Sequence, residues 1–97
     1  MVKEKYKKKI ITAISQLLPE CKIYLFGSRA GVYKISFDSD IDVGIDLGNP
    51  IPKKSLMKIE DVIYDLDIPL DIDIVDYQKA SAELKKEIKE KGILWKS

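Results

Sequence analysis

Residues 40–47, DIDVGIDL, alternate between acidic and apolar side chains over most of their length. A period of two is typical of a half-buried β-strand, because successive side chains of a strand point to opposite faces. The apolar side chains of this stretch are therefore predicted to face the core. Asp40 and Asp42 are predicted to project side by side from the opposite face.

Two carboxylates held side by side, Asp40 and Asp42, repel each other unless something compensates their charge. At 4 Å the repulsion is ~1 kcal/mol in water and ~4 kcal/mol at an effective dielectric constant of 20. An isolated pair of this kind tends to keep a proton on one member. A divalent cation removes the conflict, and carboxylate oxygens are the hard ligands that Mg²⁺ prefers. Because exposed acids alternate on many strands, this pattern predicts a metal site only together with its neighbours.

The neighbouring feature is a strand that ends in a glycine. The apolar residues 22–26 predict a strand, which Gly27 and Ser28 terminate. Glycine allows a ligand to approach the backbone closely, and amides at the start of a short helical turn suit phosphate groups. We expect such a turn through about residue 31, with Ser28 as part of the anion site. Arg29, the only arginine, would clamp a phosphate or face a partner protein.

The rest of the chain predicts helices and one more strand. Apolar residues spaced three and four apart favour helices over residues 3–18, from Pro52 to about residue 66, and from about residue 80 to Gly92. Gly92 is expected at the C′ position of the last helix, where a left-handed residue commonly stands. The apolar tail from Ile93 to Trp95 is expected to fold back onto the domain or to contact a partner.

A third strand is predicted over residues 70–75, where Asp71 and Asp73 alternate with inward-facing isoleucines. Either aspartate would lie on the same face as the other, so the alternation leaves both as candidates for a third carboxylate. The remaining acids near strand ends are expected to be solvated: Asp38, Asp46 and Asp76.

Composition limits the chemistry that this chain can use. With 97 residues we expect a single domain, residues 1–97, and the absence of histidine removes imidazole as base or metal ligand. Lysine and arginine total 17 against 16 acids, so no basic excess indicates direct nucleic-acid binding. The lysines of residues 3–9 are expected to form a solvated helix face rather than a binding patch. The lone Cys21, with no apparent signal or membrane segment, favours the reducing cytoplasm.

The combined pattern resembles the minimal nucleotidyltransferase domain of the DNA polymerase beta-type superfamily. The pattern consists of an apolar strand, Gly27-Ser28, the Asp40-Ile41-Asp42 stretch, and a later strand carrying Asp73-Ile74-Val75-Asp76. The resemblance extends over nearly the whole chain. It implies an α+β nucleotidyltransferase fold, with a small mixed β-sheet of three or more strands packed with about three to four helices. It also favours Asp73 over Asp71 as the third carboxylate.

The resemblance implies how the site residues would share the reaction. Gly27, Ser28 and Arg29 would bind the nucleotide, and the three carboxylates Asp40, Asp42 and Asp73 would be both metal ligands and catalytic residues. Two Mg²⁺ ions, or Mn²⁺ in their place, would serve an ATP substrate. Asp73 would also accept the proton of the acceptor hydroxyl.

A chain of this length holds no second domain for an acceptor, so a partner must complete the site or be the substrate. Minimal nucleotidyltransferases of this kind often pair with a small helical HEPN protein. The resemblance thus implies an adenylyltransferase antitoxin that transfers AMP from ATP to a tyrosine of a HEPN toxin. Two alternatives stay open. The chain would be a non-catalytic antitoxin that masks its partner, or a catalytic subunit that modifies a small molecule or an RNA end.

Overall fold

The structure, a computed structural model, describes residues 2–27 and 40–97. The elements follow one another as α1 (Glu4–Leu17), β1 (Lys22–Phe26), β2 (Ile41–Asp46), α2 (Lys53–Tyr64), β3 (Ile72–Asp76), the short 3-10 helix η2 (Tyr77–Lys79), α3 (Ala82–Lys91) and β4 (Ile93–Lys96). The predicted helices and strands are confirmed, with ends within two residues of those expected. The helical turn predicted after Gly27 lies outside the described residues.

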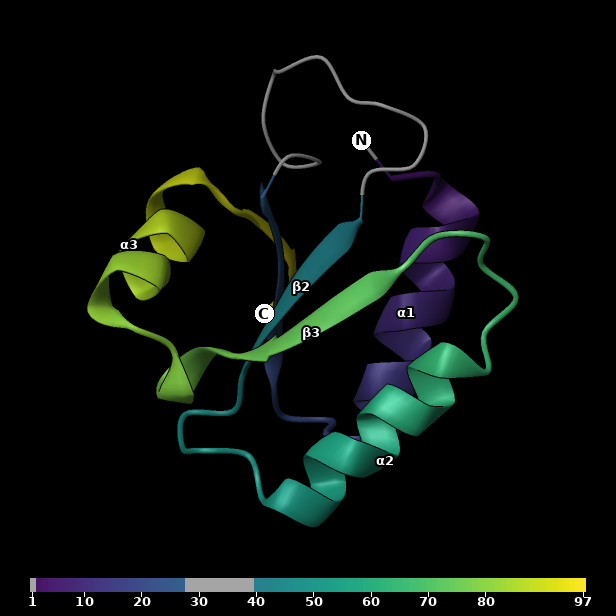
Figure 1. Ribbon diagram of the computed structural model, residues 1–97, viewed down its shortest axis with the longest axis horizontal. Coiled ribbons are helices and arrows are strands. Elements are labelled where there is room, and N and C mark those ends of the chain that lie inside the picture. Colours follow the sequence, from purple (N-terminus) through teal and green to yellow (C-terminus); the bar gives the residue numbers. More distant parts are fainter. Residues whose placement is uncertain (1, 28–39) are drawn as a thin grey trace.

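A mixed four-stranded sheet in the order β3-β2-β1-β4 forms the centre of the molecule (Figure 1). β1 pairs antiparallel with both β2 and β4, whereas β2 and β3 run parallel. β4 is formed by the apolar tail, which folds back onto the domain as one of the two expected outcomes. Its strand structure was not predicted, because four residues are too few to show a clear alternation.

The two faces of the sheet are covered unequally. α1 and α2 lie on one side of the sheet and α3 on the other (Figure 1). The larger core is built between the sheet and α1 and α2, from fully or almost fully buried side chains that include Ile10, Ile14, Ile23, Leu25, Ile41, Val43, Ile45, Ile59 and Ile63. Burial of one such side chain contributes about 1.5–3 kcal/mol, so this face supplies most of the hydrophobic stabilisation.

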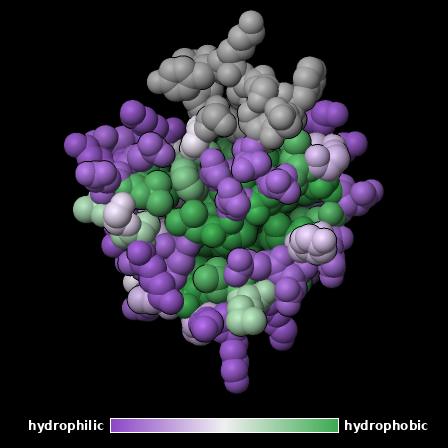
Figure 2. All heavy atoms as spheres, in the orientation of Figure 1, coloured by the Kyte–Doolittle hydropathy of each residue, from purple (hydrophilic) through white to green (hydrophobic). Residues whose placement is uncertain are grey.

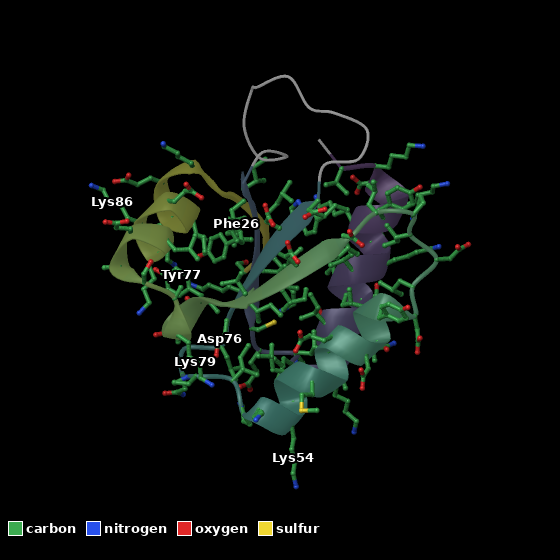
Figure 3. All side chains as sticks on the ribbon, in the orientation of Figure 1. Phe26, Lys54, Asp76, Tyr77, Lys79 and Lys86 are labelled. Atoms are coloured by element: carbon green, nitrogen blue, oxygen red, sulfur yellow. The ribbon has the colours of Figure 1, made fainter. Side chains whose placement is uncertain are left out.

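The second, smaller core lies beneath α3. Ile88 packs there on Tyr24 and Phe26 of β1, and Tyr77 of η2, which follows β3, packs against the same cluster. Phe26 and Tyr77 occupy the space between the sheet and α3 (Figure 3). This cluster covers only part of its face, and the acidic residues of β2 and β3 occupy the uncovered part. None of the described helices is long and apolar enough to cross a membrane.

Gly92 serves a different purpose from the one expected. It follows α3 directly as the C-cap, with φ −74° and ψ 160°, so it is not a left-handed C′ residue. A β-carbon at this position would collide with the carbonyl oxygen of Ile88. Glycine is therefore required for close packing between the end of α3 and the start of β4, not for its backbone conformation.

Candidate active site

The parallel pairing of β2 with β3 sets the predicted carboxylates beside one another. Asp42 and Asp73 are directly opposite each other in the register of the two strands. One level further along, the N–H of Ile41 donates to the carbonyl of Asp71 at 2.9 Å, which brings Asp40 and Asp71 to the same edge. All four carboxylates thus lie at the end of the sheet where β2 and β3 begin and where β1 ends at Gly27.

Asp42 is the most perturbed of these acids. It is half-buried, while Asp40, Asp71 and Asp73 are exposed. Burial raises the pKa of Asp42, and the negative charges of Asp73 and Asp40 raise it further, with a smaller effect from Glu87 on α3. The protein therefore collects negative charge around a carboxylate that it has partly removed from water, which is energetically unfavourable unless a cation or a proton balances it.

These residues fit a divalent cation by their chemistry and their positions. Within the described ranges, no three acidic, cysteine or histidine side chains converge closely enough to enclose an ion. The backbone nevertheless places Asp40, Asp42 and Asp73 at adjacent positions of two paired strands, and the exposed pair is able to rotate about its side-chain bonds. Carboxylates that repel one another in this way are the oxygen donors that Mg²⁺ prefers.

Gly27 lies against the same carboxylate. Its φ is +76°, in the left-handed region that favours glycine, and a β-carbon here would collide with the Oδ2 atom of Asp42. Glycine is therefore needed twice, for the turn that ends β1 and for the space that the Asp42 side chain occupies. Ser28 and Arg29, the other predicted nucleotide-binding residues, lie outside the described residues.

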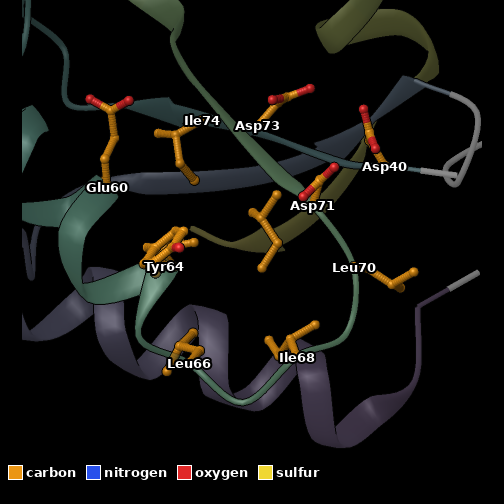
Figure 4. A pocket seen from close by; sticks show the side chains of 11 residues that line it. Asp40, Glu60, Tyr64, Leu66, Ile68, Leu70, Asp71, Asp73 and Ile74 are labelled. Atoms are coloured by element: carbon orange, nitrogen blue, oxygen red, sulfur yellow. The ribbon is translucent and has the colours of Figure 1, made fainter. Parts of the chain in front are cut away.

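A hollow of about 410 Å³ opens beside Asp40, Asp71 and Asp73 (Figure 4). Its remaining lining comes from β3, α2 and the connection between them, and most of it is apolar: Glu60, Ile63, Tyr64, Leu66, Ile68, Leu70, Ile72 and Ile74. The hollow was not foreseen from the sequence, because it depends on how the connection after α2 packs against β3.

Two other aspartates have structural roles, contrary to the expectation that they are solvated. Asp76 is only 7% exposed, and its carboxylate accepts from the N–H groups of Ile51 (2.9 Å) and Gln78 (3.2 Å). The local part of this pattern, a carboxylate accepting from the amide two residues later, is a recognised turn and could have been predicted. The bond to Ile51 joins distant segments and left no signal in the sequence.

Asp46 is the second of these aspartates. Its Oδ1 atom accepts from the N–H of Gly48 (2.9 Å) and from Nε2 of Gln78 (2.8 Å), and its Oδ2 atom lies 3.8 Å from Nζ of Lys89. Lys89 in turn donates to the hydroxyl of Tyr24 at 2.8 Å. Burial by itself raises the pKa of Asp46, but the hydrogen bonds from Gln78 and Gly48 and the nearby lysines outweigh it, so the pKa is lowered.

Comparisons with known proteins bear on the family and the fold of the chain. The family described as "Polymerase beta, Nucleotidyltransferase" matches residues 8–97. No curated protein matches the chain. Among solved structures, a toxin–antitoxin complex with AMP-PNP contains a chain that is 26% identical, with a TM-score of 0.73, over 92% of this chain and 71% of that one.

Two further solved structures show the same fold at lower identity. One is a tri-AMPylated HEPN toxin from Shewanella oneidensis in complex with an MNT antitoxin, at 24% identity and a TM-score of 0.71, covering 95% of this chain and 70% of the matched one. The other is the toxin–antitoxin complex MntA–HepT, at 24% identity and a TM-score of 0.72, covering 96% and 71%. The predicted α+β fold with a mixed sheet is thereby confirmed.

Proposed function

Because the chain belongs to the polymerase beta nucleotidyltransferase family, we propose that it transfers AMP from ATP to a tyrosine of a HEPN-type partner protein and so acts as an adenylyltransferase antitoxin. The observation that carries the proposal is the register of β2 and β3, in which Asp42 lies opposite Asp73, while Asp40 stands directly before the first residue of β2. Solved relatives in toxin–antitoxin complexes, one with an AMPylated toxin, support the choice of acceptor.

In this proposal each carboxylate has a separate task. Asp40 and Asp42 would hold the Mg²⁺ that accompanies the triphosphate, and Asp73 would join them in holding a second ion. Bound Mg²⁺ would neutralise charge on the phosphates and lower the pKa of the acceptor hydroxyl. Asp73 takes the hydroxyl proton as the tyrosine oxygen bonds to the α-phosphorus. The bond from the α-phosphorus to the bridging oxygen breaks, and pyrophosphate leaves with that electron pair.

Nucleotide binding is expected to require the metal. Without a cation, the carboxylates around Asp42 would face a triphosphate of the same charge sign. Calorimetry should therefore detect ATP binding with Mg²⁺ or Mn²⁺ and none in excess chelator. Equal affinity in the presence of the chelator would contradict the assignment of Asp40 and Asp42 as metal ligands.

A turnover experiment tests the proposed function itself. The protein is co-expressed with the product of the neighbouring reading frame as the candidate partner, and that product is analysed by intact mass spectrometry. An enzyme should silence an excess of partner and add the mass of one or more AMP groups to it. The Asp40→Asn, Asp42→Asn double variant should still bind the partner, because its helices and β4 are unchanged, but should neither modify nor silence it.

The same double variant identifies the alternative function. A protein that only masks its partner would protect at stoichiometric amounts, with or without the two aspartates, and would leave the partner's mass unchanged. Full protection by the double variant with an unmodified partner would therefore refute the catalytic proposal.

A further inference from the structure

The hollow beside the carboxylates follows the outer edge of β3. Its lining includes Asp71 and Asp73 and the isoleucines that alternate with them, Ile72 and Ile74. Successive side chains of a strand point to opposite faces of a sheet. A hollow that touches both sets must therefore run along the edge of the strand and open onto both faces. β3 stands at the end of the strand order, so no described strand pairs with this edge.

Two residues of β3 direct their backbone groups toward this hollow, on the side where no described strand lies. The carbonyl of Asp71 accepts from β2, and β2 pairs with β3 in parallel register from Ile72 onward. In a strand, the backbone groups of alternate residues point to opposite sides, so those of Ile72 and Ile74 point away from β2. The N–H and C=O groups of these two residues are thus directed outward, where another strand would hydrogen-bond to them.

The two sides of the hollow differ in chemistry. Asp40, Asp71 and Asp73 lie at one end, while Ile68 and Leu66 line the part toward the helices (Figure 4). Figure 1 is viewed with β3 in front, and in the same orientation Figure 2 shows hydrophobic surface across the middle of this face, with hydrophilic atoms beside it. The volume of about 410 Å³ lies in the range of ligand pockets.

We propose that the edge of β3 binds an extended segment of the acceptor protein as an added strand. This inference rests on the proposed function and identifies how the acceptor is held. The outward backbone groups of Ile72 and Ile74 pair with the segment, a recurrent mode of peptide recognition. The acceptor tyrosine stands on the carboxylate side next to Asp73, and the residues on either side of it enter the apolar part of the hollow.

The alternation of an added strand gives the acceptor a recognisable pattern. Residues adjacent to the tyrosine should be apolar, because they face Ile68 and Leu66. The residues two positions away share the tyrosine's side. One of them lies beside Asp71 and the other beside Val75, so a basic residue is favoured next to Asp71. A basic acceptor segment complements the local negative charge, and the edge is continuous with the candidate active site, so both features select a polypeptide of this composition.

Two synthetic peptides of identical composition test which alternate positions must be apolar and which must be basic. Lys-Val-Tyr-Val-Lys, capped at both ends, places its valines in the apolar part and one lysine beside Asp71, whichever way the added strand runs. Val-Lys-Tyr-Lys-Val reverses the two sets. Titrated into the ¹⁵N-labelled protein, the first peptide should shift the amide resonances of Ile72 and Ile74 and slow their hydrogen exchange, at a concentration at least tenfold lower than the second. Equal effects of both peptides, or no shift at β3, would overturn the proposal.

A pair of matched variants gives an independent test. Ile68→Glu adds a negative charge to the hollow and should weaken binding of the first peptide at least tenfold. Ile93→Glu makes the same change at an isoleucine that is 37% exposed on β4, the opposite edge of the sheet, and should leave binding unchanged. Equal losses in both variants would indicate that β3 has no special role.

The two proposals fail in different ways. Peptide binding at β3 without AMP transfer by any form of the protein would contradict the proposed function and leave the edge site intact. AMP transfer to the partner at an unchanged rate in Ile68→Glu, with no peptide shift at β3 in the unaltered protein, would overturn the edge site alone.

Discussion

Asp42 and Asp46 are the same residue type on the same strand and the same face, yet their surroundings are opposite. Asp42 is placed among Asp73, Asp40 and Glu87, with its pKa raised. Asp46 accepts hydrogen bonds from Gly48 and Gln78 near the ammonium group of Lys89, and its pKa is lowered. A carboxylate that receives hydrogen bonds and a positive charge from its own chain stabilises the fold. A carboxylate surrounded by other negative charges is instead suited to bind a ligand, such as a cation.

The largest difference should appear in catalysis. Asp42→Asn removes the charge that would bind metal from the centre of the cluster, and we expect AMP transfer to fall by about 10³-fold. Asp46→Asn is the matched control: it keeps an oxygen acceptor, lies away from the cluster, and should leave transfer within twofold of the unaltered protein. Rates are measured as AMP incorporated into the partner protein. Similar losses of activity in the two variants would contradict the claim that Asp42, but not Asp46, takes part in catalysis.

A second comparison lies within β3, between Asp73 and Asp71. Asp73 faces Asp42 across the ladder, so Asp73→Asn should reduce transfer by about 10²-fold, the scale for loss of one strong electrostatic stabiliser. Asp71→Asn should cost less than tenfold, because Asp71 lies one level further along. Single-turnover rates at saturating ATP distinguish the two. The opposite order would assign the third carboxylate to Asp71.

For stability the order of the two aspartates should be reversed, because the loss of Asp46 should lower the free energy of unfolding more than the loss of Asp42. Asp46→Ala leaves the N–H of Gly48 and the amide of Gln78 without their acceptor, which costs about 1–2 kcal/mol. In a domain of this size each kcal/mol lowers Tm by about 4–8 °C. Thermal unfolding of the metal-free protein measures the change, with circular dichroism as the readout. An unchanged Tm would show that water replaces these contacts without cost.

The smallest effect should be the dependence of stability on pH. A carboxyl group with a raised pKa destabilises the metal-free fold once it is ionised, so this cost grows as the pH rises above about 3.9. Asp42→Asn should therefore raise Tm at pH 7, by less than about 4 °C, and the difference should vanish below about pH 4. Asp46 has the opposite sign, because its contribution is present at neutral pH and is lost in acid. A lower Tm for Asp42→Asn at pH 7 would assign Asp42 a structural role.

The sequence predicted the fold well where side-chain periodicity is strong. The alternation around Ile41 and the helical spacing of α1 and α2 both reflect burial against a single large core, so each local pattern agrees with its tertiary environment. β4 was missed because it is short, and its place in the sheet depends on pairing with β1, which is distant in the sequence. The role of Gly92 also depends on packing, in this case against Ile88 of its own helix.

The candidate site divides in the same way. The side-by-side placement of Asp40 and Asp42 follows from strand geometry alone. The preference for Asp73 over Asp71 came from the resemblance, and the register that sets Asp73 opposite Asp42 comes from the structure. The hollow along β3 and the hydrogen bond between Asp76 and Ile51 could not be predicted from the sequence. Both join segments that are distant in the chain, and the relative placement of such segments leaves no local pattern.

The burial of Cys21 allows the local unfolding of this protein to be measured by thiol labelling. The side chain is completely buried, the sequence contains no other thiol to compete with it, and burial raises its pKa. The Cys21 thiolate is the nucleophile that attacks an alkylating reagent, so the reaction occurs only in molecules whose β1 end has separated from the core. The labelling rate, divided by that of an exposed thiol, therefore gives the population of opened molecules under native conditions. The free energies of opening of the aspartate variants become measurable in this way without denaturant or heat.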